Sequence, residues 1–175
     1  MKLASIKVLG LLLLVTAGSG IGFYKAYELK RRIADIIMLQ NAFRLLETEI
    51  YYTLTPVPSA LVLLAPRLPA PIQNFFQQVC IAMEREHQPL YQAWENGLQI
   101  IKSQCFVHKE ELSAIQNFGL TLGTGSAQEQ EKNFQLLMQR LQCALEHAEE
   151  RRTQQARIWQ YMGVCVSAAA ALLLC

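Results

Sequence analysis

The C-terminal stretch from Ser126 to Cys175 restricts the fold more than any other part of the chain. Ser126 and Glu129 have the spacing of a capping box, in which each side chain accepts a hydrogen bond from the other residue's backbone amide. The helix predicted to begin there meets no proline or glycine before Gly163. Its apolar residues recur at steps of three and four: Phe134, Leu137, Met138, Leu141, Leu145 and Ala148. This stripe needs other helices to cover it.

From Ile158 onward the same predicted helix becomes apolar on every side. At ~1.5 Å per residue, residues 158–175 span roughly 27 Å, close to the ~30 Å hydrocarbon core of a bilayer. We therefore expect one long helix that begins in water and ends as a membrane anchor.

A second apolar stretch lies near the N-terminus, from Val8 to Tyr24. Its basic start and the small residues Ala17-Gly18-Ser19 are also typical of a cleaved signal peptide. The apolar run nevertheless continues past these residues and ends in the aromatic residues Phe23 and Tyr24, which suit a bilayer interface. This favours a retained anchor over residues 1–25.

The basic residues indicate the orientation. Lys30-Arg31-Arg32 follows the first apolar stretch, and Arg151-Arg152 with Arg157 precedes the second, so we interpret both clusters as membrane flanks. The positive-inside rule then predicts that residues 26–157 lie in the cytoplasm, with both chain ends outside. The net charge of +2 and the position of these clusters do not favour a nucleic-acid-binding protein.

Residues 26–157 are expected to form an all-helical domain, because no segment alternates with a period of two. Thr55 is predicted to cap a helix, and Gly123 to end one in a left-handed conformation. The expected helices contain Leu39–Ile50, which no proline or glycine separates from the first anchor; Ala60–Ala65, short or kinked by prolines; Pro71–Arg85; Pro89–Ile101; and His108–Leu122. The fold class is therefore all-α, a helical bundle between an N-terminal transmembrane helix and a long C-terminal helix that continues into an anchor.

Few residues have the spacing of a catalytic or ligand site. Glu146 and Glu150 share a helix face as metal ligands would, although charge on a solvated face is the more ordinary interpretation. The glycines at 119, 123 and 125 lack the strand and the lysine of a phosphate loop, which favours a helix end. Glu47 and Glu49, two apart on a helix, cannot form one acid/base pair; one is expected to face solvent and the other to cap the following turn or meet a partner.

The five cysteines are odd in number and widely spaced, which indicates neither a disulfide framework nor a zinc site. A reducing compartment is the simpler assumption. The sequence predicts no cofactor, no metal and no catalytic constellation.

One motif carries a resemblance to a known family. Leu46-Glu47-x-Glu49-Ile50-Tyr51-x-x-x-Thr55-Pro56-x-Pro58-x-Ala60, followed by Arg67-Leu68, resembles the stage III sporulation protein AB family of endospore-forming bacteria. The similarity continues through Ala93-Trp94 and Phe118-Gly119-x-x-Leu122-Gly123 to the C-terminal anchor. The chain departs from the family pattern at Ile33, where a proline is common, and at Ser126, where an aspartate is usual.

The resemblance implies a non-enzymatic component of the channel complex between mother cell and forespore. Its soluble part is similar to the helical cytoplasmic domains of the platform protein in type II secretion and type IV pilus systems. The implied partners are other channel proteins, including a cytoplasmic secretion-type ATPase, at the mother-cell membrane facing the forespore. Oligomerisation through the small residues 168–171 is possible. The motif residues would then be structural or contact partners: Glu47, Glu49, Thr55, Pro56, Trp94, Gly119 and Gly123.

Two alternatives of other classes remain open. One is a membrane-attached hydrolase that uses helix carboxylates such as Glu47 or Glu146. The other is a secreted, tail-anchored helical domain whose N-terminal segment has been removed.

Overall fold

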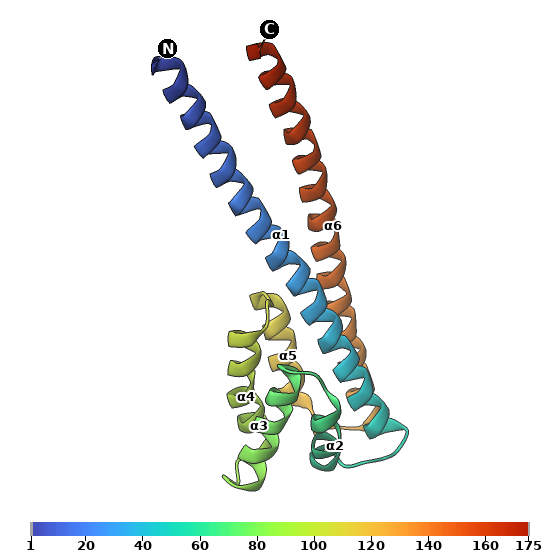
Figure 1. The fold of residues 1–175 in the computed structure, drawn as a ribbon. Helices are drawn as coiled ribbons and strands as arrows, with labels where there is room; N and C mark the ends of the chain where they lie inside the picture. Colours follow the sequence, from blue (N-terminus) through green and yellow to red (C-terminus); the bar gives the residue numbers. More distant parts are fainter. Residues whose placement is uncertain (1, 175) are drawn as a thin grey trace. The chain divides into compact units, whose positions relative to one another are not determined.

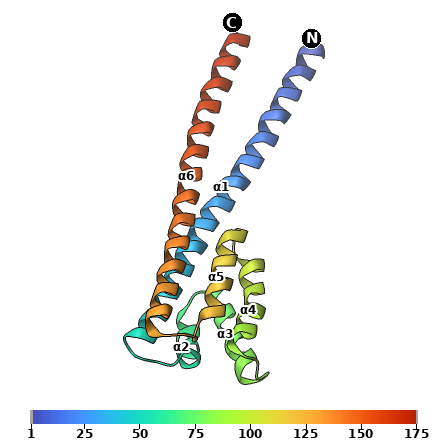
Figure 2. The same cartoon turned by 180° about the vertical axis from the view of Figure 1, so that it is seen from behind.

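The structure is a computed structural model that describes the backbone of residues 2–174 and the side chains of residue 24 and residues 26–154. Over the described residues it contains helices and no strands (Figures 1 and 2), which confirms the all-α prediction. The elements are α1 (Lys2–Tyr51), α2 (Val57–Leu64), the short 3-10 helix η1 (Ala65–Arg67), α3 (Ile72–Glu84), α4 (Leu90–Gln104), α5 (Lys109–Thr121) and α6 (Ala127–Leu174).

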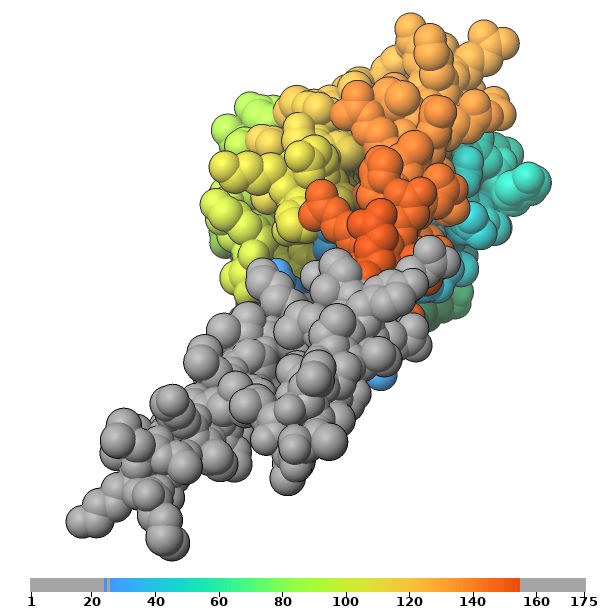
Figure 3. All heavy atoms as spheres, turned by 90° about the horizontal axis from the view of Figure 1, so that it is seen from above, coloured from blue at the N-terminus to red at the C-terminus, as the bar shows by residue number. Residues whose placement is uncertain are grey.

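The chain divides into two compact units, residues 1–31 with 150–175 and residues 32–149. The backbone of the first unit is helical, and the predicted anchors belong to α1 and α6. Apart from Tyr24, the side chains of these two apolar segments lie outside the described part of the chain. The residues that carry them are grey in Figure 3. Among the residues whose side chains are described, no helix is long and apolar enough to cross a membrane. The boundaries at residues 25 and 157 stay predictions.

The second unit, residues 32–149, is a helical bundle with one apolar core. Helix α3 packs against α2 and α4, and α4 packs against α5. The ends of α1 and α6 that belong to this unit lie side by side in Figures 1 and 2, and both bury large side chains in the same core. Those of α1 include Leu39, Phe43 and Leu46, and those of α6 include Phe134, Leu137 and Leu141. The predicted apolar stripe of the C-terminal helix is therefore covered.

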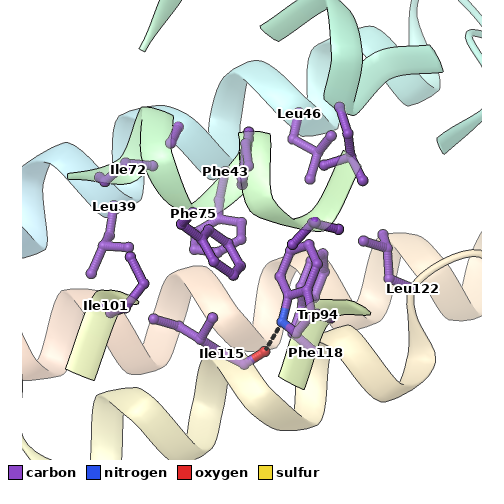
Figure 4. Close-up of a cluster of buried hydrophobic side chains, with 14 of the residues drawn as sticks. Leu39, Phe43, Leu46, Ile72, Phe75, Trp94, Ile101, Ile115, Phe118 and Leu122 are labelled. Carbon is purple, nitrogen blue, oxygen red and sulfur yellow. Dashed lines mark hydrogen bonds between the residues drawn. The ribbon is translucent and has the colours of Figure 1, made fainter. Parts of the chain in front are cut away.

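Trp94 of α4 lies at the centre of an aromatic cluster. Its ring centroid lies 4.9 Å from that of Phe75 in an edge-to-face arrangement and 5.9 Å from that of Phe118. Phe43 of α1 is 6.2 Å away, so the indole joins four helices. The indole Nε1 donates a 3.0 Å hydrogen bond to the carbonyl oxygen of Ile115, which satisfies its polar atom inside the core (Figure 4).

The turn between α5 and α6 is as predicted. Gly123 has φ of +77°, which ends α5 in a left-handed conformation. The backbone amide of Ser126 donates to the Glu129 carboxylate at 2.8 Å, and the Glu129 amide donates to the Ser126 hydroxyl at 3.3 Å. The capping box that opens α6 is therefore confirmed.

The prediction that Thr55 caps the second helix is wrong. Pro56 occupies the N-cap position of α2, and no side chain there accepts from the first turn. The Thr55 hydroxyl instead lies 2.8 Å from the hydroxyl of Thr53. Since α2 begins with Val57 and Pro58, one of its first amides is already absent, and a side-chain cap has less to satisfy.

The prediction that Arg32 belongs to a basic membrane flank is also wrong. Arg32 is only 8% exposed and forms a buried ion pair with Glu111 of α5. A step of one residue turns a helix by about 100°, so Arg32 faces the bundle while Arg31 is exposed. Asp35, one turn further on and buried, accepts a 2.8 Å hydrogen bond from the backbone amide of Phe106. These contacts attach α1 to α5 and to the loop between α4 and α5.

Candidate functional site

Two of the motif residues, Trp94 and Gly119, have a structural role in the core. A Cβ atom on residue 119 would lie 2.1 Å from Cδ1 and 2.3 Å from Nε1 of Trp94. No side chain larger than hydrogen fits at residue 119 without moving a buried indole. We therefore assign the pair to packing between α4 and α5.

Glu49 holds the turn that follows α1. Its carboxylate accepts a 2.9 Å hydrogen bond from the Thr53 hydroxyl, and its Oε1 lies 3.8 Å from Nη1 of Arg67. The backbone amide of Thr55 donates to the Glu49 carbonyl oxygen at 3.0 Å. Glu49 is thus the member of the acidic pair that caps the following turn. This is one of the roles that the sequence predicted for the pair.

Glu47 points to a different neighbour. The pKa of its carboxyl is raised above the ordinary value, first by partial burial and second by repulsion from Glu131 of α6, while Arg44 acts in the opposite direction. The pKa of Tyr51 is also raised, by burial and then by Glu131 and Glu47. We call Glu47, Tyr51 and Glu131 the acidic edge. Because its two carboxylates repel each other, a cation placed between them would be stabilised.

The acidic edge is also a junction between the two long helices. The Tyr51 hydroxyl donates a 3.1 Å hydrogen bond to the carbonyl oxygen of Ala127, at the start of α6. The Tyr51 ring meets Phe134 edge to face, with centroids 5.9 Å apart. A ligand bound at this edge would therefore contact α1 and α6 together.

A groove of about 480 Å³ lies at the ends of three helices, and we call it the terminal groove. Its lining includes no charged residue: Val57 and Pro58 from α2, Pro89, Leu90 and Tyr91 at the start of α4, and Gly119, Leu120, Leu122, Gly123 and Thr124 at the end of α5. The motif thus contributes to the groove through Pro58, Gly119, Leu122 and Gly123, while Pro56 lies one residue before its wall. Such an apolar hollow suits an apolar side chain better than a charged ligand.

The other sequence candidates are not gathered into a reactive site. Glu146 is exposed and accepts a 3.0 Å hydrogen bond from its helix neighbour Gln142. Within the part of the chain whose side chains are described, no three His, Cys, Asp or Glu residues are grouped as metal ligands. The glycines at 119 and 123 belong to the end of a helix, as predicted, and not to a phosphate loop.

The family model described as stage III sporulation protein AB matches residues 7–175. The chain belongs to the stage III sporulation protein AB family. A curated member, stage III sporulation protein AB of Bacillus subtilis (strain 168), is 27% identical over 169 residues, covering 97% of this chain and 99% of the relative.

A solved structure of a stage III sporulation protein AB also resembles this chain, with a TM-score of 0.65 and 27% sequence identity. The match covers 71% of this chain and 98% of that structure. The resemblance that the motif indicated is confirmed, and the chain is a member of a family of sporulation proteins.

Sequence reasoning missed two features of this family member. The Arg32–Glu111 ion pair joins residues far apart in the chain, and no local pattern predicts it. The terminal groove is built by the ends of three helices, and its more exposed wall residues, Tyr91 and Leu120, stood outside every motif. The available signs were that Tyr91 follows Pro89 by two residues and that Leu120 directly follows Gly119.

Proposed function

We propose that this chain is a non-enzymatic, membrane-anchored adaptor of the channel complex between mother cell and forespore. It holds its helical domain on the cytoplasmic side of the mother-cell membrane and couples partner proteins there, among them a secretion-type ATPase. The family membership supports a role in sporulation, and the finer assignment is ours.

One observation carries the proposal. The two helices that contain the predicted anchors, α1 and α6, both also contribute buried side chains to the core of residues 32–149. Phe43 and Leu46 of α1, and Phe134 and Leu141 of α6, are almost completely buried. When an outer helix of such a domain is displaced, the displacement reaches α1 and α6, since packed cores deform little.

The acidic edge is the surface on which we place the ATPase contact. A lysine or arginine of the partner would relieve the repulsion between Glu47 and Glu131 that raises the Glu47 pKa. Tyr51, at the end of α1, donates a hydrogen bond to the start of α6. A force applied at this edge therefore acts on both helices.

The test is binding of the full chain, reconstituted in lipid nanodiscs, to the secretion-type ATPase of the sporulating cell. Glu131→Lys reverses a charge at the acidic edge, and Glu146→Lys is the matched control, an exposed glutamate on the same helix outside the acidic edge. We expect Glu131→Lys to weaken binding at least tenfold, with an affinity that falls as salt rises in the unchanged chain. Equal binding by the two variants would refute the assigned surface, and no binding by the unchanged chain would refute the adaptor.

A further inference from the structure

The loop between α1 and α2 exposes two large apolar side chains. Tyr52 is 84% exposed and Leu54 is 81% exposed, more than any other large hydrophobic side chain in the described part of the chain. Leu54 has φ of +52°, a left-handed conformation that is unfavourable for a branched residue. We call Tyr52 and Leu54 the loop pair. Surface leucines are common, but two neighbours with almost full exposure in a tight loop need an explanation.

The loop pair leads directly into the wall of the terminal groove. Val57, the first wall residue, follows Leu54 after two residues, so the pair and the groove lie at the same end of the domain. Tyr91 and Leu120 on the wall are themselves about half exposed. An apolar projection and an apolar hollow are thus adjacent on one chain.

We propose that the terminal groove receives the loop pair of a second copy of this chain. A two-fold axis passing between projection and hollow inserts the pair of each copy into the groove of the other, which is the closed arrangement that symmetric dimers use. The uncharged lining means that this insertion desolvates no charge, whereas a charged occupant would find no counter-charge in the groove.

The surface area that the proposed dimer would bury is that of a weak but specific dimer. An exposed tyrosine contributes on the order of 150–200 Å² and a leucine about 100 Å². Two copies of the pair, with groove walls of similar area, would bury roughly 1,100 Å², which is near the lower limit for biological interfaces. The proposal goes beyond the adaptor function and does not use it, because none of the acidic-edge residues lines the groove.

The test measures self-association of the full chain in detergent micelles, using two differently tagged copies and their co-purification or energy transfer. Leu54→Asp places a charge on the projection, and Leu120→Lys places one on the groove wall. Both positions are exposed, so neither change disturbs the core. Leu136→Asp is the matched control, since Leu136 is 47% exposed on α6 and belongs to neither the loop pair nor the groove.

We expect each of the two variants alone to weaken self-association at least tenfold, and Leu136→Asp to leave it unchanged. A mixture of the Leu54→Asp and Leu120→Lys copies should form mixed dimers better than either forms with itself, because one junction becomes Asp against Lys and the other stays wild type.

Three outcomes would overturn the proposal. The unchanged chain could stay monomeric, the two variants could associate as well as the unchanged chain, or the mixture could fail to restore association. Persistence of the dimer in both variants would assign it to another surface, such as the predicted anchors.

Discussion

Trp94 and Gly119 are in direct contact across the interface of α4 and α5, with the indole Cδ1 at 2.1 Å from where a Cβ of residue 119 would lie. Both residues belong to the motif on which the family resemblance rests. Their contact explains why a tryptophan and a glycine occur together: the indole fills the core and reaches the Ile115 carbonyl only if the facing helix has no side chain at that point.

Gly119→Ala should destabilise the domain by about 2–3 kcal/mol, since the added methyl group overlaps a fully buried ring. Gly123→Ala is the control: a Cβ there has its nearest neighbours at 3.7 Å, and only the left-handed φ opposes it, at roughly 1 kcal/mol. Urea unfolding followed by Trp94 emission in a Trp159→Phe background measures both. An alanine at 119 that costs less than one at 123 would contradict the packing account.

Arg32→Met should cost about 3–5 kcal/mol, because it leaves the Glu111 carboxylate buried without its cation. Glu111 also accepts from the His108 amide at the start of α5, so Glu111→Leu removes a cap as well. We expect the double variant to be less destabilised than the sum of the two single variants. Urea unfolding of all four chains gives this coupling, and strict additivity would show that the two side chains act independently.

Glu47 should make the stability of the domain depend on pH, and the sign of this dependence is definite. Its pKa is higher in the folded domain than in the unfolded chain, so ionisation of Glu47 disfavours folding. The favourable contribution present below the unfolded pKa is lost as pH rises through the folded pKa. Glu47→Gln should therefore be slightly more stable than the unchanged chain at neutral pH, by less than about 1 kcal/mol, and the difference should vanish in acid.

Thermal unfolding at a series of pH values measures this difference. Glu131→Gln removes one cause of the shift, so adding Glu47→Gln to it should have a smaller effect than Glu47→Gln alone. A loss of stability in Glu47→Gln at neutral pH would mean that the carboxylate has a favourable partner in the free domain.

The described cysteines should differ in reactivity. Burial, followed by repulsion from Glu84, raises the pKa of the Cys80 thiol, and Cys105 is buried, whereas Cys143 is exposed on α6. Alkylation near pH 8 followed by mass spectrometry should modify Cys143 about ten times faster than Cys80. In urea the three rates should converge. Faster reaction at Cys80 in the folded chain would contradict the packing of α3.

The elements that the sequence predicts well are those determined locally. The Ser126–Glu129 capping box and the left-handed Gly123 depend on residues within one turn, and both are present. The stripe from Phe134 to Leu141 needs only helical periodicity, and all its large residues are at least partly buried.

Apart from the local cap assigned to Thr55, the errors concern contacts between distant segments. Arg32 stands beside two exposed basic residues in sequence, and only the position of Glu111, 79 residues later, shows that it faces inward. Glu47 and Glu49 are alike by sequence, and their roles separate only when α6 brings Glu131 to one and η1, which follows α2, brings Arg67 to the other.

In the proposed function, the domain between the predicted anchors lies in the cytoplasm. Single cysteines at Ser113 and Gln128, both exposed, on a cysteine-free background test it in intact sporulating cells with an impermeant thiol reagent. We expect both positions to be labelled only after the membrane is permeabilised. Labelling of either position in intact cells would contradict it, because the positive-inside assignment and the ATPase contact would then both be wrong.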